Sequence, residues 1–209
     1  MGKSENDRKI IGSDILVFAT DNQNKVNEIR KLAGDNFKFS FITKAEAGIN
    51  EENVENGKTI LENAMIKADY IKSKYGFDCF SEDTGLIVDA LNGEPGVYSA
   101  RYAGQENNAE NNIKKLLENL EGQTNRSAKF QTVIALNINK KQYIFEGEVT
   151  GEIIQEKQGS GGFGYDPVFM PTGYDKTFAE LGLEIKNSIS HRGKAVRKLM
   201  DFLENYNLD

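Results

Sequence analysis

The chain has 209 residues, of which 38% are hydrophobic and 28% charged, as in an ordinary soluble globular protein. This length supports one large domain with a substantial core, and the net charge of −6 excludes a general basic surface for DNA or RNA. Cys79 and His191 are the only cysteine and histidine, which excludes an intrachain disulfide and any cysteine- or histidine-rich metal site. A bound metal would therefore need carboxylate ligands, as Mg2+, Mn2+ and Ca2+ do.

The first residues, 1–14, are polar, and we expect a flexible tail followed by a single domain over residues 15–209. No apolar run is long enough to span a bilayer, and the start contains no signal-peptide core. We therefore expect a cytoplasmic protein that binds neither membranes nor nucleic acid.

The first half of the chain predicts alternating strands and helices. A short apolar run at 14–20 is typical of a buried strand, and the helical spacing that follows it ends at Gly34. Residues 37–42 alternate like a second strand, and the polar stretch 46–59 predicts a surface loop. Residues 60–75 predict a helix whose buried stripe is Leu61, Ala64, Met65, Ala68, Ile71 and Tyr75. Asn63 and Lys67 are four residues apart and share a face of this helix.

The second half predicts a brief strand at 77–80 that enters the loop SEDTG, followed by a helix at 111–120. Two alternating segments, 129–138 and 142–154, are separated by a short polar turn and predict a β-hairpin. A last helix is expected from about Ser190 to Tyr206. The predicted fold class is mixed α/β, with helices at both ends and a hairpin in the middle.

The stretch TDNQNK, residues 20–25, follows the first strand, where an α/β sheet commonly binds its ligand. Thr20, Asn22 and Lys25 could offer a hydroxyl, an amide and a positive charge to a phosphate. The alternative is an ordinary turn with Asp21 or Asn22 as the helix N-cap, and it is favoured when the stretch is taken alone.

A second cluster contains the neighbouring acids Glu82 and Asp83. A carboxylate here could hold a divalent ion or accept a proton from water, and Glu51, Glu52 or Glu55 could add a ligand from the earlier loop. Adjacent acids on a loop are more often simply solvated. For Asp89 and Arg101, farther along the chain, we expect a structural ion pair.

A third cluster joins QGSGGFGYDPVF, residues 158–169, to KNSISHRGKA, residues 186–195. The glycines indicate either a tight turn or a ligand lying against bare backbone. Ser190 as N-cap would place His191, Arg192 and Lys194 in the first turn of the last helix, where the helix dipole disfavours cations. A bound anion or a polar base edge would explain them, and so would an ion pair of Arg192 with Asp166 or Glu184.

Together these motifs resemble the inosine triphosphate pyrophosphatase family, in order, from Ile15 to Leu203. The matching segments are TDNQNK, ENGKTILENAMIKA, SEDTGLIVDALNGEPGVYSARYAG, GSGGFGYDPVF and KNSISHRGKA. The resemblance implies an elongated mixed central β-sheet flanked by helices, with two lobes and an active-site cleft between them. It also implies hydrolysis of ITP, dITP and XTP to the monophosphate and pyrophosphate, catalysed by the single domain 15–209.

The resemblance also assigns roles to residues of this chain. Asp83 would be the general base and, with Glu55, a ligand of Mg2+, for which Mn2+ could substitute. The substrate-binding residues would be Thr20, Asn22, Lys25, Thr84, Phe163, Gly164, Tyr165, Asp166, Lys186, His191 and Arg192. Phe163 would stack on the purine, while a donor such as Arg192 would meet the 6-oxo group of hypoxanthine and oppose the 6-amino group of adenine.

The resemblance has one departure and one further implication. The family's usual pair of aspartates is Glu82-Asp83 here, so the first acid is longer by one methylene. A homodimer is also implied, with Tyr98 and Tyr102 as candidate apolar contacts. The alternatives are a pyrophosphatase acting on pyrimidine or modified nucleotides, and a nucleotide-binding module without turnover.

Overall fold

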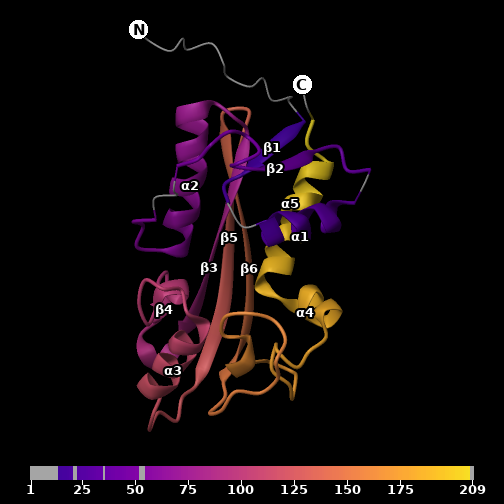
Figure 1. The fold of residues 1–209 in the computed structure, drawn as a ribbon. Coiled ribbons are helices and arrows are strands. Elements are labelled where there is room, and N and C mark those ends of the chain that lie inside the picture. The colour runs from indigo at the N-terminus through magenta and orange to yellow at the C-terminus, as the bar shows by residue number, and fades with distance from the viewer. Residues whose placement is uncertain (1–13, 21–22, 35, 52–54, 208–209) are drawn as a thin grey trace.

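A computed structural model describes residues 14–20, 23–34, 36–51 and 55–207. In these residues a mixed sheet of seven strands has the order β2-β1-β3-β5-β6-β7, with β4 paired to β3 (Figure 1). The strands are β1 (Ile15–Phe18), β2 (Ser40–Thr43), β3 (Cys79–Val88), β4 (Pro95–Gly96), β5 (Ser127–Ile138), β6 (Lys141–Ile153) and β7 (Phe169–Pro171). The helices are α1 (Gln23–Ala33), α2 (Ile60–Tyr75), α3 (Ala109–Asn119), α4 (Leu183–Ile189) and α5 (His191–Glu204). The expected mixed sheet flanked by helices is confirmed.

The long strands β3, β5 and β6 run through the whole molecule and give it an elongated shape (Figure 1). Strands β5 and β6 form the predicted hairpin, and their two-residue turn has positive φ at Asn139 (46°) and Lys140 (63°). Two such residues match the twist of the strands that they connect.

The prediction of a loop at SEDTG, residues 81–85, is wrong, because these residues belong to strand β3. Residues from Cys79 to Val88 pair antiparallel with β5 along their whole length, so the polar residues are held in extended backbone. Backbone hydrogen bonds to β5 hold this segment as a strand, although its polar composition favours a loop.

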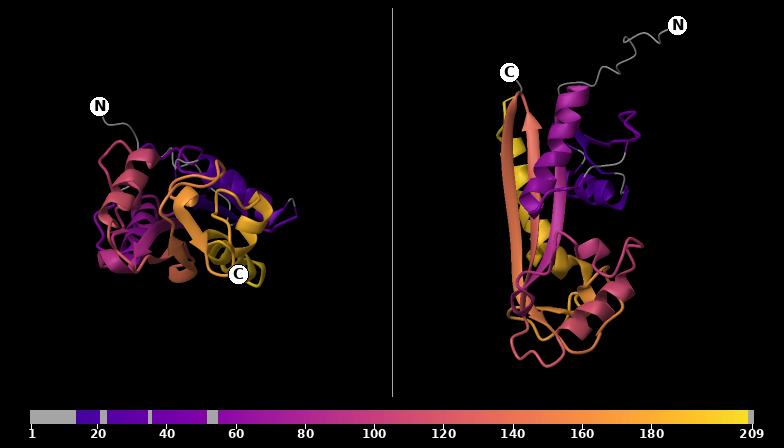
Figure 2. Two further views of the ribbon diagram at one scale, coloured as in Figure 1. Left: turned by 90° about the horizontal axis from the view of Figure 1, so that it is seen from below. Right: turned by 90° about the vertical axis from the view of Figure 1, so that its left-hand side faces the viewer.

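Side chains alternate between the two faces of the sheet, and different helices cover each face (Figure 2). Phe18, Phe80 and Ile134 belong to the core beneath α1 and α5. Val17 and Cys79, one residue away along their strands, belong to the core beneath α2. Neighbouring residues of β3 therefore face different helices.

A third core lies at the other end of the sheet and forms the second lobe. Here α3 packs on the far ends of the long strands, and Phe130, Phe169 and Phe178 contact one another. Tyr102 is buried in this core, which corrects its expected availability for a dimer contact, whereas Tyr98 is 58% exposed.

Several smaller predictions also need correction. Strand β2 begins at Ser40, three residues later than expected. In α2, Ile60 rather than Leu61 starts the buried stripe, and Lys67 is buried with it. The predicted surface loop buries Ile49, which packs in the α2 core.

The predicted tail, 1–14, lies outside the described residues apart from Asp14. None of the helices in the described ranges combines the length and the apolar composition needed to cross a bilayer.

Candidate active site

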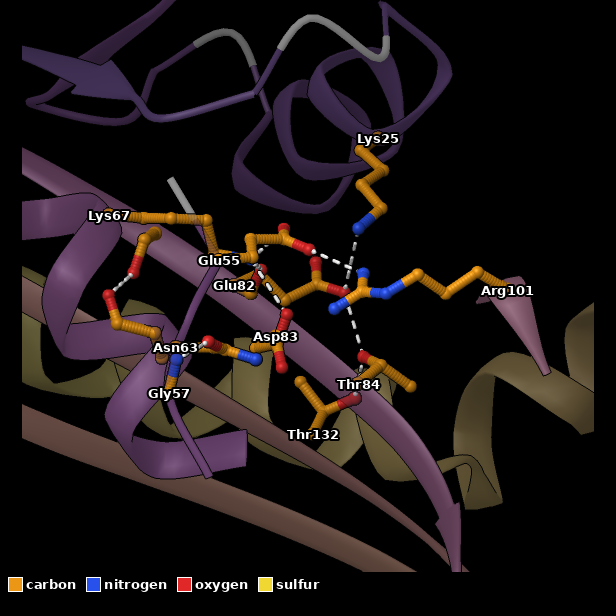
Figure 3. Close-up of polar contacts among 12 residues, drawn as sticks. Lys25, Glu55, Gly57, Asn63, Lys67, Glu82, Asp83, Thr84, Arg101 and Thr132 are labelled. Carbon is orange, nitrogen blue, oxygen red and sulfur yellow. Dashed lines mark hydrogen bonds and ion pairs between the residues drawn. The ribbon is translucent and has the colours of Figure 1, made fainter. Parts of the chain in front are cut away.

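The two neighbouring acids Glu82 and Asp83 lie midway along β3 (Figure 3) and face opposite sides of the sheet. Asp83 faces α2, and Glu82 faces α1 and α5, as strand alternation requires. Each acid is held by cations from the helices that cover its own face. The site therefore has two halves separated by the strand.

On the α2 side, the ammonium of Lys67 joins the two acids expected to bind metal. Its Nζ donates to Asp83 Oδ1 at 2.7 Å, to Glu55 Oε1 at 3.0 Å and to the main-chain oxygen of Glu82 at 2.9 Å (Figure 3). Burial disfavours the charge of Lys67, but the two carboxylates outweigh this and raise its pKa. Burial also raises the pKa of Asp83, against the effect of Lys67, which brings this carboxyl nearer to the range of a general base.

Asn63 and Arg101 complete this half of the site. Asn63 Oδ1 accepts a hydrogen bond from the main-chain N–H of Gly57 at 2.8 Å, which holds the segment that carries Glu55. Arg101 reaches Glu55 at 3.4 Å, so its expected pairing with Asp89 is wrong. Burial opposes ionisation of Glu55, but Lys67 and Arg101 outweigh it and lower its pKa.

On the other face, Glu82 contacts residues from both ends of the expected substrate site. Its Oε1 accepts from Arg192 Nε at 2.8 Å and from the Thr84 hydroxyl at 3.1 Å, and it lies 3.5 Å from Lys25 Nζ. The Glu82 side chain is only 1% exposed. Burial alone would raise its pKa, but Arg192 and Lys25 hold that pKa far below the usual range, so Glu82 is an anion. Arg192 therefore pairs with Glu82, not with Asp166 or Glu184.

The glycine-rich segment places Phe163 beside two cations. The ring is 65% exposed, and its centre lies 4.6 Å from Lys186 Nζ and 5.5 Å from Arg192 Cζ. Asp166 holds this arrangement, because its Oδ2 accepts from the main-chain N–H of Phe163 at 2.7 Å and from Lys186 at 2.5 Å. An exposed aromatic face and fixed cations therefore lie together.

The glycines of this segment are needed mainly by the protein itself. A Cβ on Gly162, where φ is +72°, would lie 2.0 Å from Asp166 Oδ2, and one on Gly159, where φ is +81°, would lie 2.7 Å from the backbone of Ala179. Around Gly164 the space is open. The tight turn thus explains Gly159 and Gly162, and open space for a ligand remains at Gly164.

Three other expected substrate-binding residues use their side chains within the protein. Tyr165 is buried and its hydroxyl donates to the main-chain oxygen of Ser99 at 2.8 Å. The Thr84 hydroxyl also contacts Thr132 Oγ1 at 2.7 Å. The His191 ring stacks on Phe130, and burial together with Arg192 lowers its pKa to about 3, so it is neutral at pH 7. For Tyr165, a substrate contact would therefore have to come from the main chain.

The predicted phosphate segment is only partly described. Thr20 follows β1, and Lys25 lies in the first turn of α1 and extends toward Glu82 (Figure 3). Asn22 lies outside the described residues, as does the proposed alternative of Asp21 or Asn22 as N-cap. The N-cap of α5 is as predicted, because Ser190 Oγ accepts from Gly193 N.

Three buried side-chain atoms in the described residues have no hydrogen-bond partner, and all three belong to this region. They are Asn63 Nδ2, Glu82 Oε2 and His191 Nδ1. Unpartnered buried polar atoms are costly and uncommon, so their concentration here indicates a place that a ligand or water completes.

Comparison with known proteins places the chain in a family. The model of the Ham1 family matches residues 16–202. The chain belongs to the Ham1 family. It is similar to a protein of Flavobacterium johnsoniae named dITP/XTP pyrophosphatase, with 55% identity over 188 residues, which cover 90% of this chain and 97% of the relative. A protein of the same name from Porphyromonas gingivalis is 49% identical over 189 residues, covering 90% of this chain and 96% of that protein.

Solved structures agree with this assignment. The Ham1 protein of Staphylococcus aureus has a TM-score of 0.85 at 40% identity, with 91% of this chain and 98% of that one covered. A HAM1 protein from Coxiella burnetii has a TM-score of 0.87 at 38% identity, with 92% and 99% covered. The family resemblance inferred from the sequence motifs is confirmed.

Sequence reasoning missed the parts played by Lys67, Glu82 and Arg101. The sequence did contain a signal for Lys67, because it lies four residues after Asn63 and therefore on the same face of the predicted helix. Glu82 was expected as one of two neighbouring acids and as a departure from a paired aspartate, but not as the partner of Lys25 and Arg192. The contact of Arg101 with Glu55 joins residues 46 positions apart and left no local signal.

Proposed function

We propose that this chain hydrolyses deaminated purine nucleoside triphosphates, ITP, dITP and XTP, to the nucleoside monophosphate and pyrophosphate. It is an enzyme that acts on nucleotides and so keeps deaminated bases out of DNA and RNA. The observation that carries the proposal is the presence of two half-sites on opposite faces of β3. On one face Asp83 and Glu55 contact the Lys67 ammonium, and on the other Glu82 contacts Arg192, which lies beside the exposed Phe163. The names of the Flavobacterium and Porphyromonas relatives support the same activity.

Asp83 accepts a proton from the attacking water as the water oxygen bonds to phosphorus and the bond between the α- and β-phosphates breaks. Its raised pKa and its contact with Lys67 suit this role. Lys25 balances negative charge that develops on the departing pyrophosphate, together with Thr20 and Asn22 of the same segment. At the other half, Phe163 stacks on the purine, and Arg192, Lys186 and His191 approach its edge. Thr84, Gly164, Tyr165 and Asp166 complete the expected contacts.

Mg2+ would be held by Glu55 and Asp83, and Mn2+ could replace it. Both carboxylates already converge on a single cation, the Lys67 ammonium, at 3.0 and 2.7 Å. Among the described residues no group of three or more acids, histidines or cysteines forms a ready metal site. Two carboxylates fit Mg2+, which usually takes its remaining ligands from water and substrate phosphates. When bound, the ion would neutralise the triphosphate and polarise the bond that breaks.

We further propose that the chain acts in the cytoplasm as a homodimer. The exposed ring of Tyr98 supports such a contact. Sedimentation of the purified chain tests the dimer.

The first experiment is to measure pyrophosphate release from ITP, dITP, XTP, GTP, ATP and dTTP, with Mg2+ and again with EDTA. Fast, metal-dependent turnover of the first three, with ATP and GTP nearly inert, is the expected result. A preference for dTTP would favour the pyrimidine alternative and remove the base-pocket assignment. An absence of turnover with every nucleotide would favour a binding module.

A further inference from the structure

Glu82 is the one described side chain that contacts both the phosphate-side cation and the base-side cation. Its Oε1 lies 2.8 Å from Arg192 Nε and 3.5 Å from Lys25 Nζ, and these two residues lie in the first turns of different helices. The main-chain oxygen of the same residue accepts from Lys67. Glu82 and the residues before and after it in β3 all pair with β5, which leaves its backbone little freedom to move.

The contact with Arg192 controls where the guanidinium can lie. A guanidinium is planar, so a hydrogen bond to Nε fixes the orientation of the whole group about the end of the side chain. The bond is charge-assisted, and the partners are 1% and 10% exposed, so water competes weakly for it. Held in this way, the Arg192 guanidinium lies 5.5 Å from the centre of the Phe163 ring.

We propose that Glu82 is a positioning residue that sets base selectivity by holding Arg192 beside the stacked purine. This inference rests on the proposed function, because it assumes that Arg192 meets the 6-oxo group of the base. Glu82 itself does not touch the base. It acts through Arg192, and its contact with Lys25 is a separate effect at the phosphate end.

The two effects of Glu82 can be separated by comparing substrates. Every nucleoside triphosphate carries the same phosphates. If a Glu82 substitution acts by displacing Lys25, it should therefore change kcat/KM equally for ITP and ATP. If the substitution acts by displacing Arg192, it should change kcat/KM differently for ITP and ATP, because hypoxanthine has an acceptor at position 6 and adenine a donor. The ratio of the two kcat/KM values therefore reports on Arg192 alone.

The test is Glu82→Gln, which keeps the side-chain length and removes the charge. We expect the ITP-to-ATP ratio of kcat/KM to fall by about tenfold or more, mainly through a higher KM for ITP. The matched control is Glu121→Gln, which changes an exposed acid beyond α3 and should leave the ratio unaltered. Arg192→Met should lower the ratio too, and adding Glu82→Gln to it should lower the ratio no further.

Equal losses for ITP and ATP in Glu82→Gln would overturn the proposal and leave Glu82 a role at the phosphate end only. A further fall of the ratio in the double variant would also contradict it, since Glu82 would then act without Arg192. Melting curves establish that each variant is folded. If Glu82→Gln does not fold, Glu82→Asp is used instead, because it keeps the charge but its carboxylate does not reach as far toward Arg192. An unchanged ITP-to-ATP ratio of kcat/KM in Glu82→Asp would contradict the proposal. A wild-type chain without preference for ITP over ATP is a different result, because it overturns the proposed function itself.

Discussion

The two faces of β3 turn adjacent acids into groups with opposite properties. Glu82 is 1% exposed, contacts two cations of α1 and α5, and has a pKa far below its ordinary value. Asp83 is 12% exposed, contacts Lys67 of α2, and has a pKa raised by burial. Both are carboxylates in the same strand, so their surroundings alone create the difference.

This comparison shows how two adjacent residues of one strand can take different roles in a site. An acid held permanently as an anion can fix the positions of cations, but it is a poor proton acceptor. An acid with a raised pKa accepts a proton more readily and suits catalysis.

Asp83→Asn should reduce kcat for ITP by about 10²- to 10⁴-fold, because the amide cannot accept the proton from water. The fold should persist, since Asn keeps the shape and one oxygen for Lys67. Steady-state kinetics and a melting curve measure the two effects. A variant with near-normal kcat would show that Asp83 is not the base.

Lys67→Met should destabilise the protein by about 3–5 kcal/mol, because it leaves two neighbouring carboxylates without their shared cation. Urea unfolding measures this loss. Lys74→Met is the control on the same helix, since Lys74 is exposed and contacts Glu51. Mg2+ should restore more stability to Lys67→Met than it adds to the wild-type chain, and an equal gain would contradict binding of the ion between Glu55 and Asp83.

Glu55→Gln should raise the Mg2+ concentration needed for half-maximal activity by about 10- to 100-fold, because one of two protein carboxylates is lost. A Mg2+ titration at saturating ITP provides the measurement. Glu51→Gln alters an acid of the same segment that contacts Lys74 instead, and its Mg2+ requirement should be normal. Equal shifts in the two variants would exclude a specific role for Glu55.

The smallest effect concerns His191, on the Glu82 face. Its folded-state pKa is lowered to about 3 from an ordinary value of 6.5, so between these values only the unfolded chain binds the proton. The free energy of unfolding should therefore fall as pH falls from 6.5, by at most about 1.4 kcal/mol per pH unit from this group. His191→Phe removes the contribution, so urea unfolding at pH 4.5 to 7 should give it a shallower slope. Parallel slopes would show that His191 is protonated in the folded chain.

Much of the fold could be predicted from local patterns. The helices at 60–75 and 191–204, the hairpin and the Ser190 cap follow from residue spacing and turn chemistry, which act within a few residues. The family motifs also indicated Lys25, Asp83, Phe163 and Arg192 as site residues. The structure brings Lys25 and Arg192 to Glu82, and Arg192 to Phe163.

The tertiary structure alone decided which way each acid faces and what holds it. Polar composition favoured a loop at SEDTG, whereas pairing with β5 made it a strand and sent Glu82 and Asp83 to opposite faces. The partners Lys67, Arg101 and Arg192 come from segments 15 to 110 residues away. The backbone of Ala179, which leaves no room for a Cβ on Gly159, is also distant in the sequence, whereas Gly162 is crowded by Asp166 of its own turn. Local sequence sets the conformation of short segments. The charge state and the contacts of a buried acid depend instead on which helices cover that face of the sheet, and these helices come together only when the sheet is assembled.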